Sequence, residues 1–116
     1  MNNILIVEDD DSLREIMVKI LQEKFRVLEA ENGVQAMDSL DSQKVDLVIL
    51  DLVMPKQNGL ETMLEAKFLY PHLKFILISG SEEELARAKS FGGEFHLVKP
   101  VKKSTLVSKV EEVLCI

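Results

Sequence analysis

Cysteine and long apolar runs are both scarce in this chain. Its only cysteine, Cys115, cannot form a disulfide within the chain, so nothing argues for an oxidising compartment. No apolar stretch approaches the roughly 18 residues of a membrane span, and the N-terminus lacks the basic region and apolar core of a secretory signal. We therefore expect a soluble protein in the cytoplasm, with no membrane partner.

Positive charge is also in short supply. The chain has 14 Lys and Arg against 20 Asp and Glu, for a formal charge of −6. Affinity for nucleic acid depends largely on neutralising phosphates, so we expect no direct binding of DNA or RNA. Internal repeats, low-complexity tracts and linkers are absent, and 116 residues fit one domain. The expected organisation is one domain over residues 1–116.

Apolar runs alternate with stretches of helical period, which predicts an α/β fold with five strands and five helices around a parallel sheet. The runs at 4–7, 47–50 and 75–78 are wholly apolar, as expected of strands covered on both faces. The runs at 25–29 and 95–98 are interrupted by polar residues. These two are therefore the predicted edge strands.

The helical stretches carry apolar stripes and start signals. The first stripe predicts a buried face made of Leu13, Ile16, Met17, Ile20 and Leu21. Capping residues stand three positions before a Gln or Glu, in the pairs Asn32 with Gln35, Asn58 with Glu61 and Ser81 with Glu84. The helix over 82–91 has the thinnest apolar face: Leu85, Ala88 and Phe91. It is the helix expected to shift most easily.

Reactive polar side chains follow four of the apolar runs. They are Glu8 and Asp9, Asp51, Ser79, and Lys99. The carboxyl ends of parallel strands lie side by side, and ligands bind at that edge of an open sheet. Three acids, one hydroxyl and one ammonium should therefore converge on one site suited to a metal ion and a phosphoryl group.

Each of these residues alone also has a plain structural explanation. Acids after a strand often cap the next helix, which is the favoured interpretation for Asp10 and Asp11. For Glu8 and Asp9 the balance changes, because Asp51 ends another buried strand and neighbouring carboxylates repel one another without a cation. Mg²⁺ suits such a place, since it prefers oxygen ligands and is held by one or two carboxylates.

The order and spacing of these residues resemble the receiver domains of two-component response regulators. The matching stretches are ILIVEDD at 4–10, DLVILDLVMP at 46–55 with NG at 58–59, LISG at 77–80, and LVKP at 97–100. The resemblance implies a flavodoxin-like, doubly wound (βα)5 fold with a parallel sheet in strand order 2-1-3-4-5. It also implies a cis bond between Lys99 and Pro100.

The resemblance further implies a role for each site residue. Asp51 would be the phosphoacceptor, Asp9 a direct Mg²⁺ ligand, and Glu8 a partner that acts mainly through water on the metal. The backbone carbonyl of Val53 would complete the protein's share of the coordination. Of the remaining site groups, Lys99 would pair with phosphoryl oxygen and Ser79 would be the switch hydroxyl that moves to bond it.

By the same resemblance the protein is a signalling switch that turns over no separate substrate. A histidine kinase or phosphotransfer protein would phosphorylate it. A downstream protein would bind the face made by the helix at 82–91, the strand at 95–98 and the last helix, and phosphorylation-linked dimers occur among such regulators. The chain would act through another protein or be a fragment of a longer regulator.

Some positions depart from the family pattern. His96 stands where the family usually has a switching Tyr or Phe, so it is either a pH-sensitive switch or an edge histidine with no special task. Val53 and Ser81 stand where the family, by the same resemblance, tunes how fast the phosphoryl group is lost. The apolar Val53 cannot orient water, which predicts slow self-dephosphorylation. Lys102 opposes the dipole of the last helix, so it is more plausibly a contact residue than a cap.

Two other functions remain open on the sequence alone. A Mg²⁺-dependent phosphatase with an aspartyl nucleophile would usually carry a second Asp two positions after the first, where this chain has Val53. A receiver that docks without being phosphorylated would not require the set Glu8, Asp9, Asp51, Ser79 and Lys99. The intact set therefore favours the phosphorylated switch.

Overall fold

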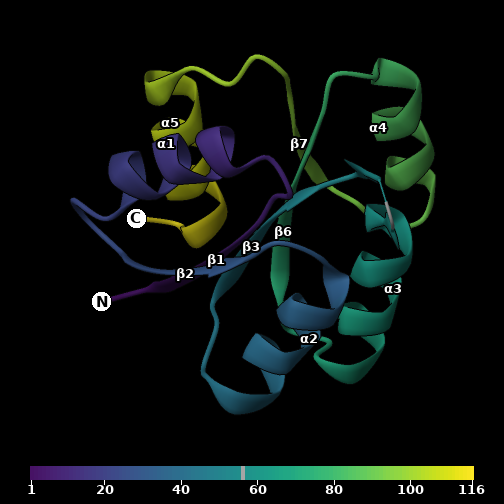
Figure 1. Cartoon of the computed structure of the whole chain (residues 1–116), viewed down its shortest axis with the longest axis horizontal. Helices are drawn as coiled ribbons and strands as arrows, with labels where there is room; N and C mark the ends of the chain where they lie inside the picture. The colour runs from purple at the N-terminus through teal and green to yellow at the C-terminus, as the bar shows by residue number, and fades with distance from the viewer. Residues whose placement is uncertain (56) are drawn as a thin grey trace.

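The computed structural model describes residues 1–55 and 57–116, and its centre is a parallel five-stranded sheet in the order β2-β1-β3-β6-β7 (Figure 1). The strands are β1 (Asn3–Val7), β2 (Arg26–Ala30), β3 (Leu47–Asp51), β6 (Lys74–Ser79) and β7 (Phe95–Val98). Counted along the sheet's own strands, this is the predicted order 2-1-3-4-5. The two runs interrupted by polar residues are the edges, as predicted.

Five helices cover the two faces of the sheet. They are α1 (Asp11–Leu21), α2 (Gly33–Ser42), α3 (Gly59–Leu69), α4 (Glu82–Ser90) and α5 (Lys103–Leu114). Helices α1 and α5 pack against one face, and α2, α3 and α4 contribute to the core on the other (Figure 1). No helix in the described part of the chain is both long and apolar enough to cross a bilayer.

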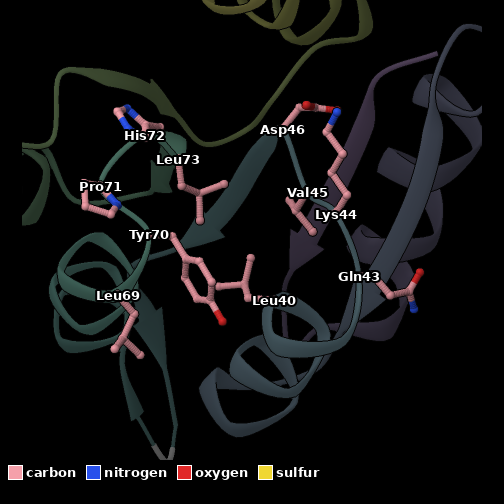
Figure 2. Close-up of a pocket in the computed structure, with 10 residues that line it drawn as sticks. All are labelled: Leu40, Gln43, Lys44, Val45, Asp46, Leu69, Tyr70, Pro71, His72 and Leu73. Atoms are coloured by element: carbon pink, nitrogen blue, oxygen red, sulfur yellow. The ribbon is translucent and has the colours of Figure 1, made fainter.

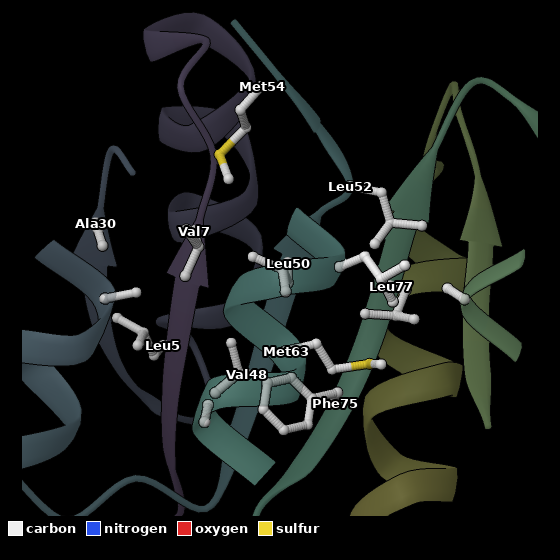
Figure 3. Packing of buried hydrophobic residues seen from close by; sticks show 14 of the residues in the cluster. Leu5, Val7, Ala30, Val48, Leu50, Leu52, Met54, Met63, Phe75 and Leu77 are labelled. Carbon is white, nitrogen blue, oxygen red and sulfur yellow. The ribbon is translucent and has the colours of Figure 1, made fainter. Parts of the chain in front are cut away.

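Strand alternation divides the apolar core into two halves. In β1, Leu5 and Val7 face the α2–α4 side, whereas Ile4 and Ile6 face the α1–α5 side. Figure 3 shows the first half, where Met63 of α3 lies beside Phe75 of β6. Each such buried side chain contributes roughly 1.5–3 kcal/mol of hydrophobic free energy. The three central strands are therefore fixed from both sides.

Helix starts follow the predicted capping residues. Each accepts a backbone hydrogen bond: Asn32 from Gln35 (2.9 Å), Asn58 from Leu60 (2.9 Å) and Ser81 from Glu84 (3.2 Å). For Asn58 the donor is one residue earlier than expected. Helix α1 begins in the same way, because the Asp10 side chain accepts from Leu13 at 3.0 Å. The cap interpretation of Asp10 is confirmed.

Three expectations about the elements are wrong in detail. Ile16 is 54% exposed and Phe91 is 51% exposed, although both were assigned to buried faces. Ile16 lies on the outer flank of α1, and Phe91 follows the last residue of α4, where Gly92 turns the chain at a φ of 99°. The sequence pattern also missed a short antiparallel pair, β4 (Val53–Met54) with β5 (Gln57–Asn58), between β3 and α3.

Candidate functional site

Strand register places two acids side by side at the carboxyl edge of the sheet. Val7 of β1 pairs with Leu50 of β3, and each is followed directly by an acid, Glu8 or Asp51. Asp9 completes the group, because one carboxylate oxygen from each of the three acids lies within 4.8 Å of the others. The predicted convergence of these three carboxylates is confirmed.

Two of these carboxylates are buried. Glu8 is 1% exposed and Asp51 is 3% exposed, whereas Asp9 is open to solvent. Lys99 reaches both buried acids, with its Nζ 3.0 Å from Asp51 Oδ2 and 3.2 Å from Glu8 Oε1. Burying a carboxylate is costly unless it is paired. The single Lys99 ammonium offsets only part of the free-energy cost of burying the Glu8 and Asp51 carboxylates.

Burial and the neighbouring charges shift the pKa values of Glu8 and Lys99. Burial, followed by the hydrogen bond and charge of Asp51, raises the pKa of Glu8 from 4.5 to about 8, although Lys99 opposes the shift. Burial alone would lower the pKa of Lys99, but the hydrogen bond and attraction from Asp51, with help from Glu8, raise it above its ordinary value. Lys99 is therefore charged at neutral pH, and Glu8 is largely protonated without a further cation.

The donor set fits a divalent cation that prefers oxygen ligands. Glu8 Oε1 is buried, and its contact with Lys99 is an ion pair without the alignment of a hydrogen bond, so this oxygen has no hydrogen-bond partner among the described residues. Three ionised carboxylates facing one ammonium would leave an excess of two negative charges. Mg²⁺ would offset that excess and give the buried oxygen a partner.

Ser79 lies at the same edge, but its hydroxyl is bonded elsewhere. The side chain is fully buried, and alternation along β6 puts it on the side of Phe75 and Leu77, away from Glu8 and Asp51. Its Oγ accepts the Ser81 N–H at 3.0 Å, and its carbonyl accepts the Lys99 N–H at 2.9 Å. The backbone of Ser79 thus adjoins the site, whereas its hydroxyl supports the start of α4.

The remaining predicted residues lie around this centre. Val53 is 58% exposed, and its N–H donates to Asp51 Oδ1 at 3.1 Å. His96 is exposed on the edge strand β7, paired in register with Leu77. Lys102 stands at the N-cap of α5 and makes no capping bond with its side chain, as predicted. The Lys99–Pro100 bond is cis, as the resemblance implied.

The family model of the response regulator receiver domain matches residues 4–111 of this chain. The chain belongs to this family. Receiver domains of two-component systems are phosphorylation-controlled signalling domains, and the five-stranded flavodoxin-like sheet described above is their fold.

The receiver is similar to proteins of different sizes. It is 32% identical to the chemotaxis protein CheY of Halobacterium salinarum. The matched region covers 96% of this chain and 95% of that protein. It is 34% identical to the transcriptional regulatory protein CpxR of Escherichia coli, but spans only 50% of that longer protein. Similar domains therefore occur both alone and joined to other domains.

A solved structure is similar over almost the whole fold. The response regulator protein TrrA from Thermotoga maritima, in complex with Mg²⁺ and BeF, has a TM-score of 0.89 and 32% identity, over 97% of this chain and 99% of that one. The chemotaxis protein CheY4 of Vibrio cholerae has a TM-score of 0.91 at 26% identity. The first of these is a receiver that holds Mg²⁺.

Sequence reasoning missed two residues that shape the receiver's site. Gly59, at the start of α3, lies so close to the chain after β3 that a Cβ there would be 2.4 Å from the Asp51 carbonyl oxygen. Arg14 of α1 donates to the carbonyl oxygen of Glu8 at 2.8 Å. The sequence marked Asn58 as a helix cap and the pair Asn58-Gly59 as part of the family pattern but gave no role to Gly59 itself, and the only hint of Arg14 was its position three residues after Asp11.

A separate hollow lies at the opposite edge of the sheet. It measures about 540 Å³ and lies between the ends of α2 and α3, near the starts of β3 and β6. Figure 2 shows the Tyr70 ring beside Leu40, and the Tyr70 hydroxyl donates to Asp41 of α2. None of the site residues lines this hollow. The hollow and the group of three acids are therefore two separate places on the receiver.

Proposed function

We propose that this receiver is a switch in which Asp51 accepts a phosphoryl group from a histidine kinase or phosphotransfer protein. The observation that carries the proposal is the position of Asp51. Its carboxylate is 3% exposed at the end of β3, within 3.0 Å of the Lys99 ammonium and grouped with Glu8 and Asp9. A purely structural acid would not require this surrounding of two further acids and a lysine.

The chemistry follows from these groups. A carboxylate oxygen of Asp51 attacks phosphorus in line, a P–O bond to Asp51 forms, and the bond between phosphorus and the donor's leaving group breaks. The donor keeps the electron pair of that bond. Lys99, already beside Asp51 Oδ2, can pair with the phosphoryl oxygens that arrive. The product is a labile acyl phosphate, so the signal is temporary.

Mg²⁺ belongs to the same proposal. Glu8, Asp9 and Asp51 would hold it, together with the backbone carbonyl of Val53. When bound, it would supply positive charge that favours the anionic phosphoryl group. Among the described residues Glu8 Oε1 has no hydrogen-bond partner, and this supports the assignment, because a buried oxygen without a hydrogen bond is otherwise costly.

The switch would run through Ser79 toward α4. Phosphorylation adds roughly −1.5 to −2 charges and three acceptor oxygens near Asp51. If the Ser79 hydroxyl turns to donate to them, the Ser81 N–H at the start of α4 loses its present acceptor. Helix α4 buries only Leu85 and Ala88, so it has little apolar contact to resist a shift. A downstream protein, or a second copy, would recognise the changed α4–β7–α5 face.

The proposal extends to the whole of residues 1–116 as one receiver that acts in the cytoplasm and has no substrate of its own. A phosphatase role is disfavoured, because Val53 stands where a catalytic acid would be required. Similar receivers occur both alone and within longer proteins, so the partner in this proposal is either a separate protein or another part of a longer chain.

The central test is phosphorylation by a small donor. Wild type and Asp51→Asn are incubated with Mg²⁺ and acetyl phosphate, and intact mass spectrometry counts the added phosphoryl groups. We expect one on wild type and none on Asp51→Asn. Asp38→Asn, an exposed acid on α2, is the matched control and should be modified like wild type. Equal modification of wild type and Asp51→Asn would overturn the assignment.

His96 as part of the switch needs its own test. The chain has two histidines, and His72 lies in the loop before β6, so it serves as an internal control. We expect Mg²⁺ with beryllium fluoride, a phosphoryl mimic, to move the ring NMR signals of His96 while those of His72 stay in place. Unchanged His96 signals would leave it an ordinary edge histidine.

A further inference from the structure

Arg14 is the most heavily bonded side chain near the acidic site, although it is not one of the predicted site residues. Its side chain is 12% exposed, and its guanidinium contacts three separate segments. Nη1 donates to the Glu8 carbonyl oxygen at 2.8 Å, Nη2 to Asp11 Oδ1 at 2.6 Å, and Nε to Glu29 Oε1 at 3.2 Å. Nη2 also lies 3.6 Å from Glu31 Oε1. One side chain thus connects the end of β1, the start of α1 and the end of β2.

These contacts fix the peptide group between Glu8 and Asp9. The Glu8 N–H donates to the Ala30 carbonyl of β2 at 3.1 Å, and the Glu8 carbonyl accepts from Arg14. The residue is therefore held on both sides of its Cα. Its carbonyl carbon is bonded directly to the nitrogen of Asp9, so the orientation of this peptide determines where Asp9 begins.

Asp9 has no comparable support of its own. Among residues 1–55 and 57–116, its carboxylate makes no hydrogen bond or ion pair. The position of this exposed acid consequently depends on its backbone and on the neighbouring cap at Asp10, which accepts from Leu13 at 3.0 Å. Loss of the Arg14 contact would release one of the two backbone anchors before Asp9.

We propose that Arg14 is a positioning residue for the metal site, acting through the Glu8–Asp9 peptide rather than through its charge. This inference rests on the proposed Mg²⁺ site. Groups that orient metal ligands without touching the metal commonly change metal affinity by about 10–100-fold when they are altered. The planar fork of arginine makes several directed bonds at once, which a lysine ammonium cannot reproduce.

Charge and geometry predict opposite results, which makes the proposal testable. If only the positive charge mattered, Arg14→Lys would leave Mg²⁺ affinity unchanged, and Arg14→Gln would tighten it by removing a cation near the site. If Arg14 positions the ligands, both variants bind Mg²⁺ more weakly. Arg26→Lys is the matched control, because Arg26 is exposed at the start of β2, at the end of the sheet opposite the acids.

The experiment is a titration of ¹⁵N-labelled protein with MgCl2, followed through the amide signals of Asp9 and Leu52. We expect Kd to rise about 10-fold in Arg14→Lys, to rise in Arg14→Gln, and to stay unchanged in Arg26→Lys. Urea unfolding in EDTA checks folding separately, because a merely structural role would lower stability without changing Kd. If Arg14→Lys fails to fold, the direction of the change in the Mg²⁺ Kd of Arg14→Gln decides between positioning and charge.

Failure of the inference can be told apart from failure of the proposed function. A wild-type Kd retained in Arg14→Lys, or a tighter Kd in Arg14→Gln, would overturn the positioning role while the metal site stands. A wild type that shows no saturable Mg²⁺ binding would overturn both.

Discussion

Glu8 is an acid whose surroundings favour its neutral form. It is 1% exposed, and its pKa is raised to about 8 by burial and by Asp51. In the unfolded chain the same group would titrate near 4.5. The folded state therefore binds this proton more tightly, and the contribution of Glu8 to stability is complete below about pH 4.5 and is lost as pH rises through about 8.

The loss of this contribution at higher pH gives a prediction for the metal-free protein. The free energy of unfolding in EDTA should fall between about pH 4.5 and about pH 8, with a steepest slope approaching that of one proton. Glu8→Gln cannot ionise, so its stability should vary less over that interval. Urea unfolding of both proteins at several pH values measures the difference. Parallel curves for the two proteins would contradict the raised pKa.

The apolar side chain of Val53 should slow the loss of the phosphoryl group. It is 58% exposed next to Asp51 and cannot hydrogen-bond an attacking water. We expect the phosphorylated protein to keep its label far longer than seconds without a phosphatase, and Val53→Asn to lose it a few-fold faster. Intact mass spectrometry after removal of the donor gives both rates. Val34→Asn, on the 63% exposed Val34 of α2, should match wild type.

At the scale of elements, local chemistry accounts for most of what the sequence predicted. Capping side chains and apolar alternation act over a few residues, so they mark the starts of α2 and α4 and the three central strands. The short β4–β5 pair lacks such a signal, because two residues per strand give no period. The exposure of Ile16 likewise depends on how α1 is placed against the rest of the fold, which its own stripe does not encode.

Close approach of α3 to β3 yields a prediction for Gly59. A Cβ there would lie 2.4 Å from the Asp51 carbonyl oxygen and 2.7 Å from Leu52 Cα, both rigid backbone atoms. Gly59→Ala should therefore destabilise the protein by about 1–3 kcal/mol. Gly80 has nothing within 4 Å of an added Cβ, so Gly80→Ala serves as control and should cost less. Urea unfolding measures both changes, and equal stabilities would refute the steric argument.

At the scale of the whole molecule, the sequence predicted which residues meet but not all that holds them. Strand order brings Glu8, Asp51 and Lys99 to one edge, and the family resemblance supplied that order. Ser79 belongs to the same edge, yet the direction of its hydroxyl depends on which face of the sheet its side chain takes in β6 and on the hydrogen bond from the Ser81 N–H. The contacts of Arg14 with Glu29 and Glu31 span 15 and 17 positions of the chain, so no local pattern could reveal them.

Metal binding should appear in global stability. A ligand that binds only the folded state stabilises it by RT ln(1 + [L]/Kd), about 1.4 kcal/mol at ten times Kd. For a domain of this size the melting temperature should then rise by roughly 5 °C. Asp9→Asn should lose most of the shift. Asp10→Asn is the matched control, because asparagine also caps helices well and should leave the shift intact.

The bond between Ser79 Oγ and the Ser81 N–H joins the sheet edge that carries Asp51 to the start of α4. Thermodynamic coupling between two sites is reciprocal for binding. If the turning of Ser79 transmits the signal outward, a protein that prefers the shifted α4 must tighten the binding of a phosphoryl mimic at Asp51 by the same factor. A partner would then not simply read the state of this receiver but would also help to set it.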